Sequence, residues 1–233
     1  MRKRPRVVAI VQARMSSTRL PGKVLASVGG SPMLQRQIDQ LRAIEGVDQL
    51  IIATSNHPTD DVLAKTFDNS GISVYRGDLH DVLARYADAA RQFHADVIVR
   101  LTADCPLHTP DTVAEVLRAF LSSGADYMSN VEPYTRPDGL DVEVFTLAAL
   151  DDAAKNATDL KDREHVTPYL RRSPTLNRVY FQHSPPHRSG LRWTVDTEED
   201  LSHVRKIWER LDAIGPAPHS FSTILSAIED SNS

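Results

Sequence analysis

Apolar positions in the first half of the chain follow two different spacings. Four short runs rich in β-branched side chains are typical of buried strands, and they occupy residues 7–11, 49–54, 72–75 and 96–101. Four longer segments repeat apolar residues at helical spacing, namely residues 33–44, 60–69, 78–94 and 110–124. This alternation predicts right-handed crossover units and a mostly parallel sheet, which together indicate an α/β fold.

The second half of the chain is less regular. Further strands are expected at residues 125–130, 140–145, 176–182 and 191–195. Helices are expected at residues 146–156, 162–172, 197–211 and 221–228, and Thr197 is a typical residue for a helix N-cap. The length of 233 residues fits one large domain or one domain with a small appendage.

Charge and composition exclude several classes of protein. A net charge of −4 argues against an obligate nucleic-acid coat or a membrane-surface binder. No apolar run approaches the roughly 20 residues of a membrane span. The basic N-terminus is followed by only five apolar residues, too few for a signal peptide, so we expect a cytoplasmic protein.

Cysteine and histidine offer no metal site in the sequence. A single cysteine, Cys105, permits neither an internal disulfide nor a cysteine-based zinc site, and we interpret it as a packing residue. Three histidines lack metal-binding spacing, and we interpret them as surface residues: His183, His187 and His203.

The segment that directly follows the first strand is the strongest functional signal. Residues 12–23 read Gln-Ala-Arg-Met-Ser-Ser-Thr-Arg-Leu-Pro-Gly-Lys, without the spacing of a P-loop or a dinucleotide fingerprint. A polar connection between strand and helix is the plainer interpretation. The density of hydroxyls and cations favours a polyphosphate site instead, built from Arg14, Ser16, Ser17, Thr18, Arg19 and Lys23.

Two aspartates end strand-like runs elsewhere in the chain. Asp104 follows residues 96–101 and Asp196 follows residues 191–195. Each aspartate also fits a plainer role, since Asp104 precedes a turn at Pro106 and Asp196 precedes a helix start. If both faced one triphosphate, they would form a Mg²⁺ clamp of the kind used for in-line displacement.

Other polar clusters are weaker signals. Asp81 stands at a helix start, where acids favour the helix dipole, and Arg76 could contact a base or ribose. Asp141 and Glu143 would share one face of a strand, which suits sugar hydroxyls. Glu164 and His165 are not expected to act as a metal pair, because adjacent helix residues do not face together.

The chain resembles the CMP-sugar cytidylyltransferases, that is, the 3-deoxy-manno-octulosonate and acylneuraminate enzymes. Within them it is most similar to the subgroup named for spore coat polysaccharide biosynthesis protein F. The resemblance runs from about residue 7 to 211. Besides the loop at 12–23, it is carried by residues 53–55, 76–77, 81–83, 85–86, 102–106, 126–127, 129–130, 139–141, 163–169 and 192–196.

This resemblance implies a three-layer α/β/α nucleotide-diphospho-sugar transferase-like fold with a mostly parallel sheet. It also implies that residues 1–233 form a single domain, in which a small lobe near residues 130–175 makes a dimer contact. The implied reaction transfers CMP from CTP to an acidic sugar and releases pyrophosphate, for surface polysaccharide or glycan precursors. The implied cofactor is Mg²⁺, and the implied assembly is a homodimer.

Site roles also follow from the resemblance. Catalysis is assigned to Arg14, Lys23 and Asp104, and metal binding to Asp104 and Asp196. Nucleotide binding is assigned to Ala13, Arg14, Ser16, Ser17, Thr18, Lys23, Thr54, Ser55, Arg76 and Asp81. Acceptor binding is assigned to Asn130, Asp141, Glu143, Arg163 and His165.

The loop and the first aspartate depart from the two named branches. Met15-Ser16-Ser17 replaces the glycine-rich loop of the acylneuraminate branch, and Ala103 replaces a glycine of the octulosonate branch. The acceptor therefore stays open. The alternatives are another base, a non-sugar acceptor such as a phosphonate, a metal-dependent glycosyltransferase, and a nucleotide-sensing module without catalysis.

Overall fold

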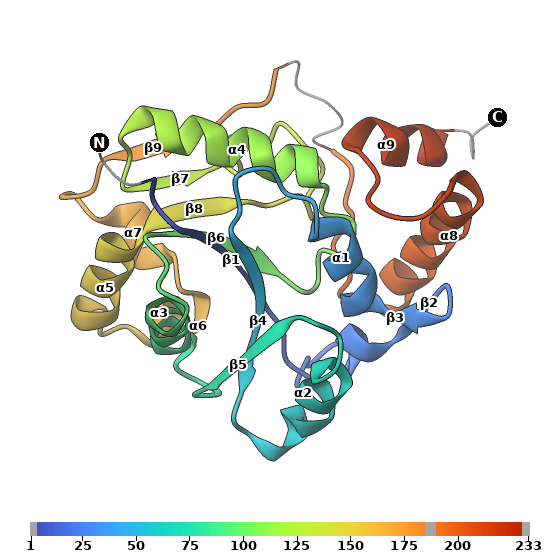
Figure 1. Ribbon diagram of the computed structural model, residues 1–233, viewed down its shortest axis with the longest axis horizontal. Coiled ribbons are helices and arrows are strands. Elements are labelled where there is room, and N and C mark those ends of the chain that lie inside the picture. The colour runs from blue at the N-terminus through green and yellow to red at the C-terminus, as the bar shows by residue number, and fades with distance from the viewer. Residues whose placement is uncertain (1–3, 185–189, 230–233) are drawn as a thin grey trace.

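A seven-stranded sheet forms the centre of the molecule. The computed structural model describes residues 4–184 and 190–229. Within them the strand order is β5-β4-β1-β6-β8-β7-β9 (Figure 1). The strands are β1 (Val7–Gln12), β4 (Gln49–Ser55), β5 (Ser73–Gly77), β6 (Val97–Thr102), β7 (Tyr127–Ser129), β8 (Glu143–Thr146) and β9 (Arg178–Tyr180).

The sheet is parallel on one side and mixed on the other. Strands β5, β4, β1 and β6 run parallel. Strand β8 pairs antiparallel with both β6 and β7, and β9 pairs parallel with β7. The order reverses at β1, since the chain leaves β1 for β4 on one side and later returns to β6 on the other. Such a reversal places a crevice at the carboxyl ends of the strands, where α/β proteins bind ligands.

Helices cover both faces of the sheet and one end of the molecule (Figure 1). One face packs against α1 (Met33–Leu41), α2 (Asp61–Phe67) and α4 (Pro110–Ser123). The other packs against α3 (Val82–Gln92), α5 (Leu147–Asn156), α6 (Leu160–His165) and α7 (Pro168–Arg172). A third cluster joins α8 (Glu198–Ile214) and α9 (Phe221–Glu229), with Trp193 and Trp208 among its buried residues.

Strand β1 shows why the sheet lies between two helical layers. Its residues alternate between the two cores, with Val7, Ala9 and Val11 in one and Val8 and Ile10 in the other. Since neighbouring side chains of a strand point to opposite faces, an unbroken apolar run requires cover on both faces. The expected α/β class with a mostly parallel sheet is confirmed.

Several predicted elements differ from the structure. The strand expected at residues 191–195 is wrong, because this segment forms only an isolated β-bridge, between Arg192 and Asp138. The helix expected at 162–172 is two helices, broken at Val166 with a φ of 71°. The strand expected at 140–145 begins only at Glu143, so Asp141 lies outside it.

The remaining short elements surround the loop at residues 12–23. A single-turn helix, η1 (Lys23–Leu25), ends that loop, and a hairpin of β2 (Ser27–Val28) and β3 (Ser31–Pro32) leads to α1. A second single-turn helix, η2 (Pro58–Asp60), follows β4. Among the described residues, no helix has both the length and the apolar character needed to cross a membrane.

Candidate functional site

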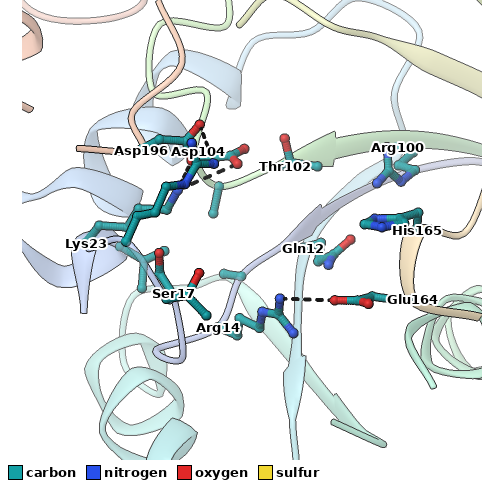
Figure 2. A pocket seen from close by; sticks show the side chains of 15 residues that line it. Gln12, Arg14, Ser17, Lys23, Arg100, Thr102, Asp104, Glu164, His165 and Asp196 are labelled. Atoms are coloured by element: carbon teal, nitrogen blue, oxygen red, sulfur yellow. Dashed lines mark hydrogen bonds and ion pairs between the residues drawn. The ribbon is translucent and has the colours of Figure 1, made fainter. Parts of the chain in front are cut away.

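A cavity of about 320 Å³ lies at the carboxyl ends of β1 and β6 (Figure 2). The two strands pair in register there, with Gln12 opposite Thr102. The cavity is also lined by the loop at residues 12–23, by Asp104 and Asp196, and by Glu164 and His165 of α6. Figure 2 separates two regions: a Lys23 end, made by Lys23, Asp104 and Asp196, and an Arg100 end, made by Gln12, Arg100 and His165.

Lys23 is the centre of the first region. Its side chain is 9% exposed. Nζ donates to the carbonyl of Val195 at 2.6 Å and to Asp196 Oδ1 at 3.1 Å, and it lies 3.7 Å from Asp104 Oδ2. One ammonium is therefore held between the two predicted carboxylates, which come from segments about 90 residues apart in the chain.

Gly22 allows the backbone turn that places Lys23 in this position. Its φ of 74° lies in the left-handed region that favours glycine. Its N–H donates to the carbonyl of Met15 at 2.9 Å, which closes the loop on itself. The loop is also tied to the end of β4 through Asp60. The buried carboxylate of Asp60 accepts from the N–H of Met15 at 2.7 Å and from the hydroxyl of Ser55.

Three cations contact Asp196. Besides Lys23, Arg19 contacts its Oδ2 at 2.8 Å and Arg192 at 2.6 Å. Asp104 is affected in the same way: burial raises its pKa, but the Lys23 charge and a hydrogen bond from Thr102 outweigh that and hold the pKa below its ordinary value. Asp104 is thus ionised at neutral pH, and each of the two carboxylates is paired with a cation. Cations held at this end of the cavity suit a polyanionic ligand.

Arg14 connects the loop to the opposite wall of the cavity. Its guanidinium lies 3.6 Å from Glu164 Oε1 on α6, and both side chains are partly exposed (Figure 2). Such a partly exposed pair contributes little to stability. Arg14 can therefore turn to a phosphate at low cost.

The cavity brings together about half of the predicted site residues. Those that line it are Ala13, Arg14, Ser17, Thr18, Lys23, Asp104, His165 and Asp196. Those that do not line it are Ser16, Thr54, Ser55, Arg76, Asp81, Asn130, Asp141, Glu143 and Arg163.

Most residues of the second group have structural contacts instead. Arg76 pairs with Asp61 at 2.6 Å and donates to the carbonyl of Ser55. Asp81 caps α3 through the N–H of Ala84 and pairs with Arg163. Asn130 donates to the carbonyl of Leu140 at 2.9 Å and accepts from the N–H of Val142 at 2.8 Å, so it braces the segment before β8.

Asp141 lies just before β8 and is mostly desolvated. Burial, followed by the charges of Asp138 and Glu143, raises its pKa to about 6. Its Oδ2 is 3.4 Å from the hydroxyl of Tyr134. The carbonyl of Asp141 pairs with His108 Nε2 at 2.9 Å, and burial lowers the pKa of that histidine, so it is neutral and donates there.

Glu143 is fully buried behind the Arg100 end. It accepts from Arg100 at 2.5 Å, from the hydroxyl of Tyr127 at 2.5 Å, from Arg171 at 2.8 Å and from Thr167 at 3.2 Å. Burial raises its pKa, but the two guanidinium groups outweigh it and lower the pKa to about 2. Its carboxylate is therefore fully occupied by protein groups.

The sequence prediction missed four polar residues that line the cavity: Gln12, Arg100, Thr102 and Glu164. Arg100 could have been found, because it is the one charge within the apolar strand at residues 97–101. Among the described residues, no group of three or more His, Cys, Asp or Glu side chains is placed to hold a metal ion.

Outside the cavity, one histidine prediction is wrong. His183 is 2% exposed and pairs with Glu115 at 2.7 Å, so it is not a surface residue. His203 is exposed as predicted, and His187 lies outside the described residues. Cys105 is buried, and burial raises the pKa of its thiol well above the ordinary value, which agrees with a packing role.

Comparison with known proteins identifies the family. Residues 8–216 match the family model described as cytidylyltransferase. The spore coat polysaccharide biosynthesis protein SpsF of Bacillus subtilis strain 168 is 34% identical over 211 residues, which cover 88% of this chain and 87% of SpsF.

Two solved structures share the fold. A cytidylyltransferase from Leptospira borgpetersenii superposes with a TM-score of 0.88 at 28% identity, over 98% of this chain and 95% of that one. A CMP:2-keto-3-deoxy-manno-octonic acid synthetase complexed with CTP has a TM-score of 0.67 at 18% identity, over 88% and 99%. By fold, by cavity and by these matches, the chain belongs to the cytidylyltransferase family of enzymes.

Proposed function

We propose that this enzyme transfers CMP from CTP to an acidic sugar and releases pyrophosphate, as a step toward surface polysaccharide or glycan precursors. The observation that supports it best is the Lys23 ammonium, fixed between Asp104 and Asp196 at the carboxyl edge of the sheet. A triphosphate needs cations held rigidly where negative charge develops, and the same cavity offers Arg14 and Arg19 beside Lys23.

In the proposed reaction an acceptor hydroxyl attacks the α-phosphorus of CTP in line. A bond forms between the acceptor oxygen and phosphorus, the bond to the β-phosphate oxygen breaks, and the hydroxyl proton leaves to solvent or a nearby base. Lys23 and Arg14 stabilise the charge that builds on the pyrophosphate. The protein's contribution is therefore mainly positioning and electrostatic stabilisation, as in other phosphoryl transfers.

Asp104 and Asp196 suit a divalent cation. Both offer carboxylate oxygens, the ligands that Mg²⁺ prefers, and two carboxylates with substrate phosphates make a common Mg²⁺ set. The structure already holds one cation, the Lys23 ammonium, between the same oxygens. When bound, Mg²⁺ would neutralise phosphate charge, and Lys23 would then turn toward the phosphates.

We also propose that the enzyme is a cytoplasmic homodimer that pairs through residues 130–175. Two large apolar side chains of this segment are exposed in the single chain, Leu160 at 83% and Tyr134 at 45%. Sedimentation velocity should give a dimer, and Leu160→Asp should shift it toward monomer. A monomeric wild type at micromolar concentration would refute this part.

Pyrophosphate release tests the function directly. CTP is incubated with Mg²⁺ and either 3-deoxy-manno-octulosonate, N-acetylneuraminate, a neutral hexose or a phosphonate, and the other three nucleoside triphosphates serve as comparisons. We expect release with CTP and an acidic sugar. The Arg118→Gln variant, which alters only an exposed ion pair with Glu45, should match the wild type.

Other outcomes identify the alternatives. Release with a different nucleotide, or with the phosphonate, would change the substrate but keep the reaction. Tighter calorimetric binding of UDP-sugars than of CTP would indicate a glycosyltransferase. CTP binding without turnover on any acceptor would indicate a nucleotide sensor and would overturn the proposed function.

A further inference from the structure

The Arg100 end of the cavity has polar atoms that the protein leaves without partners. Arg100 lies on β6, opposite Glu143 on β8, and its side chain is 17% exposed. One guanidinium nitrogen, Nη1, donates to Glu143 at 2.5 Å, whereas the buried Nε has no hydrogen-bond partner. A buried donor without a partner is costly, and Arg100 lines the cavity, so a ligand that satisfies this guanidinium would be favoured there.

Gln12 adds the complementary group from the neighbouring strand. Its Oε1 is buried and also lacks a hydrogen-bond partner. Figure 2 shows Gln12, Arg100 and His165 facing the same part of the cavity, away from Lys23. A cationic donor beside a free acceptor suits a ligand that carries an anionic group next to a hydroxyl.

Arg100 keeps donors that Glu143 does not accept. Its Nη1 donates to Glu143, which also pairs with Arg171, and Arg171 lies 3.8 Å from Glu132 as well. The other carboxylate on this side of the cavity, Glu164, lies 3.6 Å from Arg14. Among the described residues, Glu143 is therefore the one carboxylate that pairs with Arg100. The remaining donors of this guanidinium lie in a desolvated wall, where an anionic ligand group binds strongly.

The separation of the two ends of the cavity suits two anionic substrates. A triphosphate and an acidic acceptor repel each other, and both must enter one cavity. Lys23 at one end and Arg100 at the other provide separate positive charges for the two anions (Figure 2). Each substrate can then be held without its charge lying beside the other.

We propose that Arg100 binds the anionic group of the acceptor and so determines specificity, and that Glu143 is the positioning residue that holds its guanidinium. The inference rests on the proposed function, because it assigns the second substrate of that reaction. Four protein groups fix Glu143, so it aims Arg100 without touching the acceptor. An acceptor whose acidic group is masked is a poor ligand for this end.

Binding measurements test Arg100 independently of turnover. The probes are 3-deoxy-manno-octulosonate, N-acetylneuraminate and the methyl ester of each, titrated by calorimetry into the wild type and the Arg100→Gln, Arg100→Lys and Arg118→Gln variants. CTP with Mg²⁺ is titrated into the same proteins. Arg100→Gln leaves Glu143 paired with Arg171, Tyr127 and Thr167, so the fold is kept.

In the wild type, at least one acid should bind more tightly than its ester. Arg100→Gln should weaken that acid by roughly 10- to 100-fold, the range expected for a lost charge-assisted hydrogen bond, and leave CTP affinity within about twofold. Arg100→Lys should recover part of the loss, and Arg118→Gln should bind as the wild type does. Glu143→Gln should raise the acceptor KM with little change in kcat, and adding it to Arg100→Gln should have little further effect.

Three results would overturn the inference. They are equal binding of acids and esters by the wild type, an unchanged acid affinity in Arg100→Gln, and a loss of CTP affinity as large as that of the acid. Absence of acid binding by the wild type would count as the first result. The proposed function fails separately, on pyrophosphate release: an enzyme that binds acids through Arg100 but never turns CTP over would keep this inference and lose that one.

Discussion

The two ends of the cavity differ in how their charges are held. At the Lys23 end, the side chain of Asp104 is 34% exposed, and that of Arg19, which pairs with Asp196, is 63% exposed. At the Arg100 end, Glu143 is 2% exposed and joins residues of β6, β7, β8 and α7. Charges at the first end remain accessible to a ligand. Glu143 at the second also holds secondary-structure elements together, so we expect its removal to cost stability and changes at the first end to cost activity.

Removal of Glu143 should have the largest effect on folding. Glu143→Ala leaves Arg100 and Arg171 without their shared carboxylate, and breaking a buried pair costs about 4 kcal/mol. Urea denaturation should show this loss. The control is Glu45→Ala, which removes an exposed partner of Arg118 and should cost less than about 1 kcal/mol. Equal stabilities of the two variants would remove the distinction between the ends.

The largest effect on activity is expected for Lys23. Lys23→Met removes the ammonium between Asp104 and Asp196, and loss of one such preorganised charge costs about 10²- to 10³-fold in rate. Asp196 keeps Arg19 and Arg192, so the variant should fold. Steady-state pyrophosphate release is the measurement, with Arg19→Met as the exposed comparison, expected to lose less than about tenfold. A Lys23→Met enzyme with wild-type kcat/KM would contradict the role of this residue.

Asp104→Asn should cost about a hundredfold in kcat/KM, roughly 3 kcal/mol of transition-state stabilisation. The amide keeps the shape of the side chain and loses the charge that a cation and Lys23 share. Circular dichroism and the melting temperature should match the wild type, which separates this variant from Glu143→Ala. Full activity in a normally folded Asp104→Asn protein would exclude Asp104 from the mechanism.

The smallest effect expected is a gain in stability at Asp141. Its pKa is raised from 3.8 to about 6, so its contribution to stability is fully present below pH 3.8 and is lost as the pH rises through 6. Asp141→Asn should therefore be more stable than the wild type at pH 8, by about 2 kcal/mol. The difference should shrink toward pH 4, as measured by urea denaturation. A variant less stable than the wild type at pH 8 would indicate that the charged form is stabilised in the fold.

Local sequence patterns predicted the parallel half of the molecule well and the rest less well. The strands at residues 7–11 and 49–54 and the helix after Pro110 are bounded by their own residues. The break at Val166, in contrast, divides a segment that has helical spacing throughout. The segment at residues 191–195 forms an isolated β-bridge and not a strand. Both depend on packing against distant segments, which periodicity does not encode.

Site prediction divides in the same way. The loop at residues 12–23 carries its own cations, hydroxyls and Gly22, and it does line the cavity. Arg76 and Asp81 look equally suited to a ligand but are occupied by Asp61 and Arg163. Residue type shows which chemistry a side chain can perform, whereas its partners decide whether it is free to perform it.

The amino-acid sequence by itself determined the sheet between two helical layers and the positively charged loop, because apolar alternation and local charge density are short-range properties. Tertiary structure alone decided that Arg100 opens into the cavity while Glu143 closes behind it. Their pairing depends on the antiparallel register of β6 and β8, across 43 residues of chain. That register is set by burial of both strands between the helices, a free energy that belongs to the whole fold.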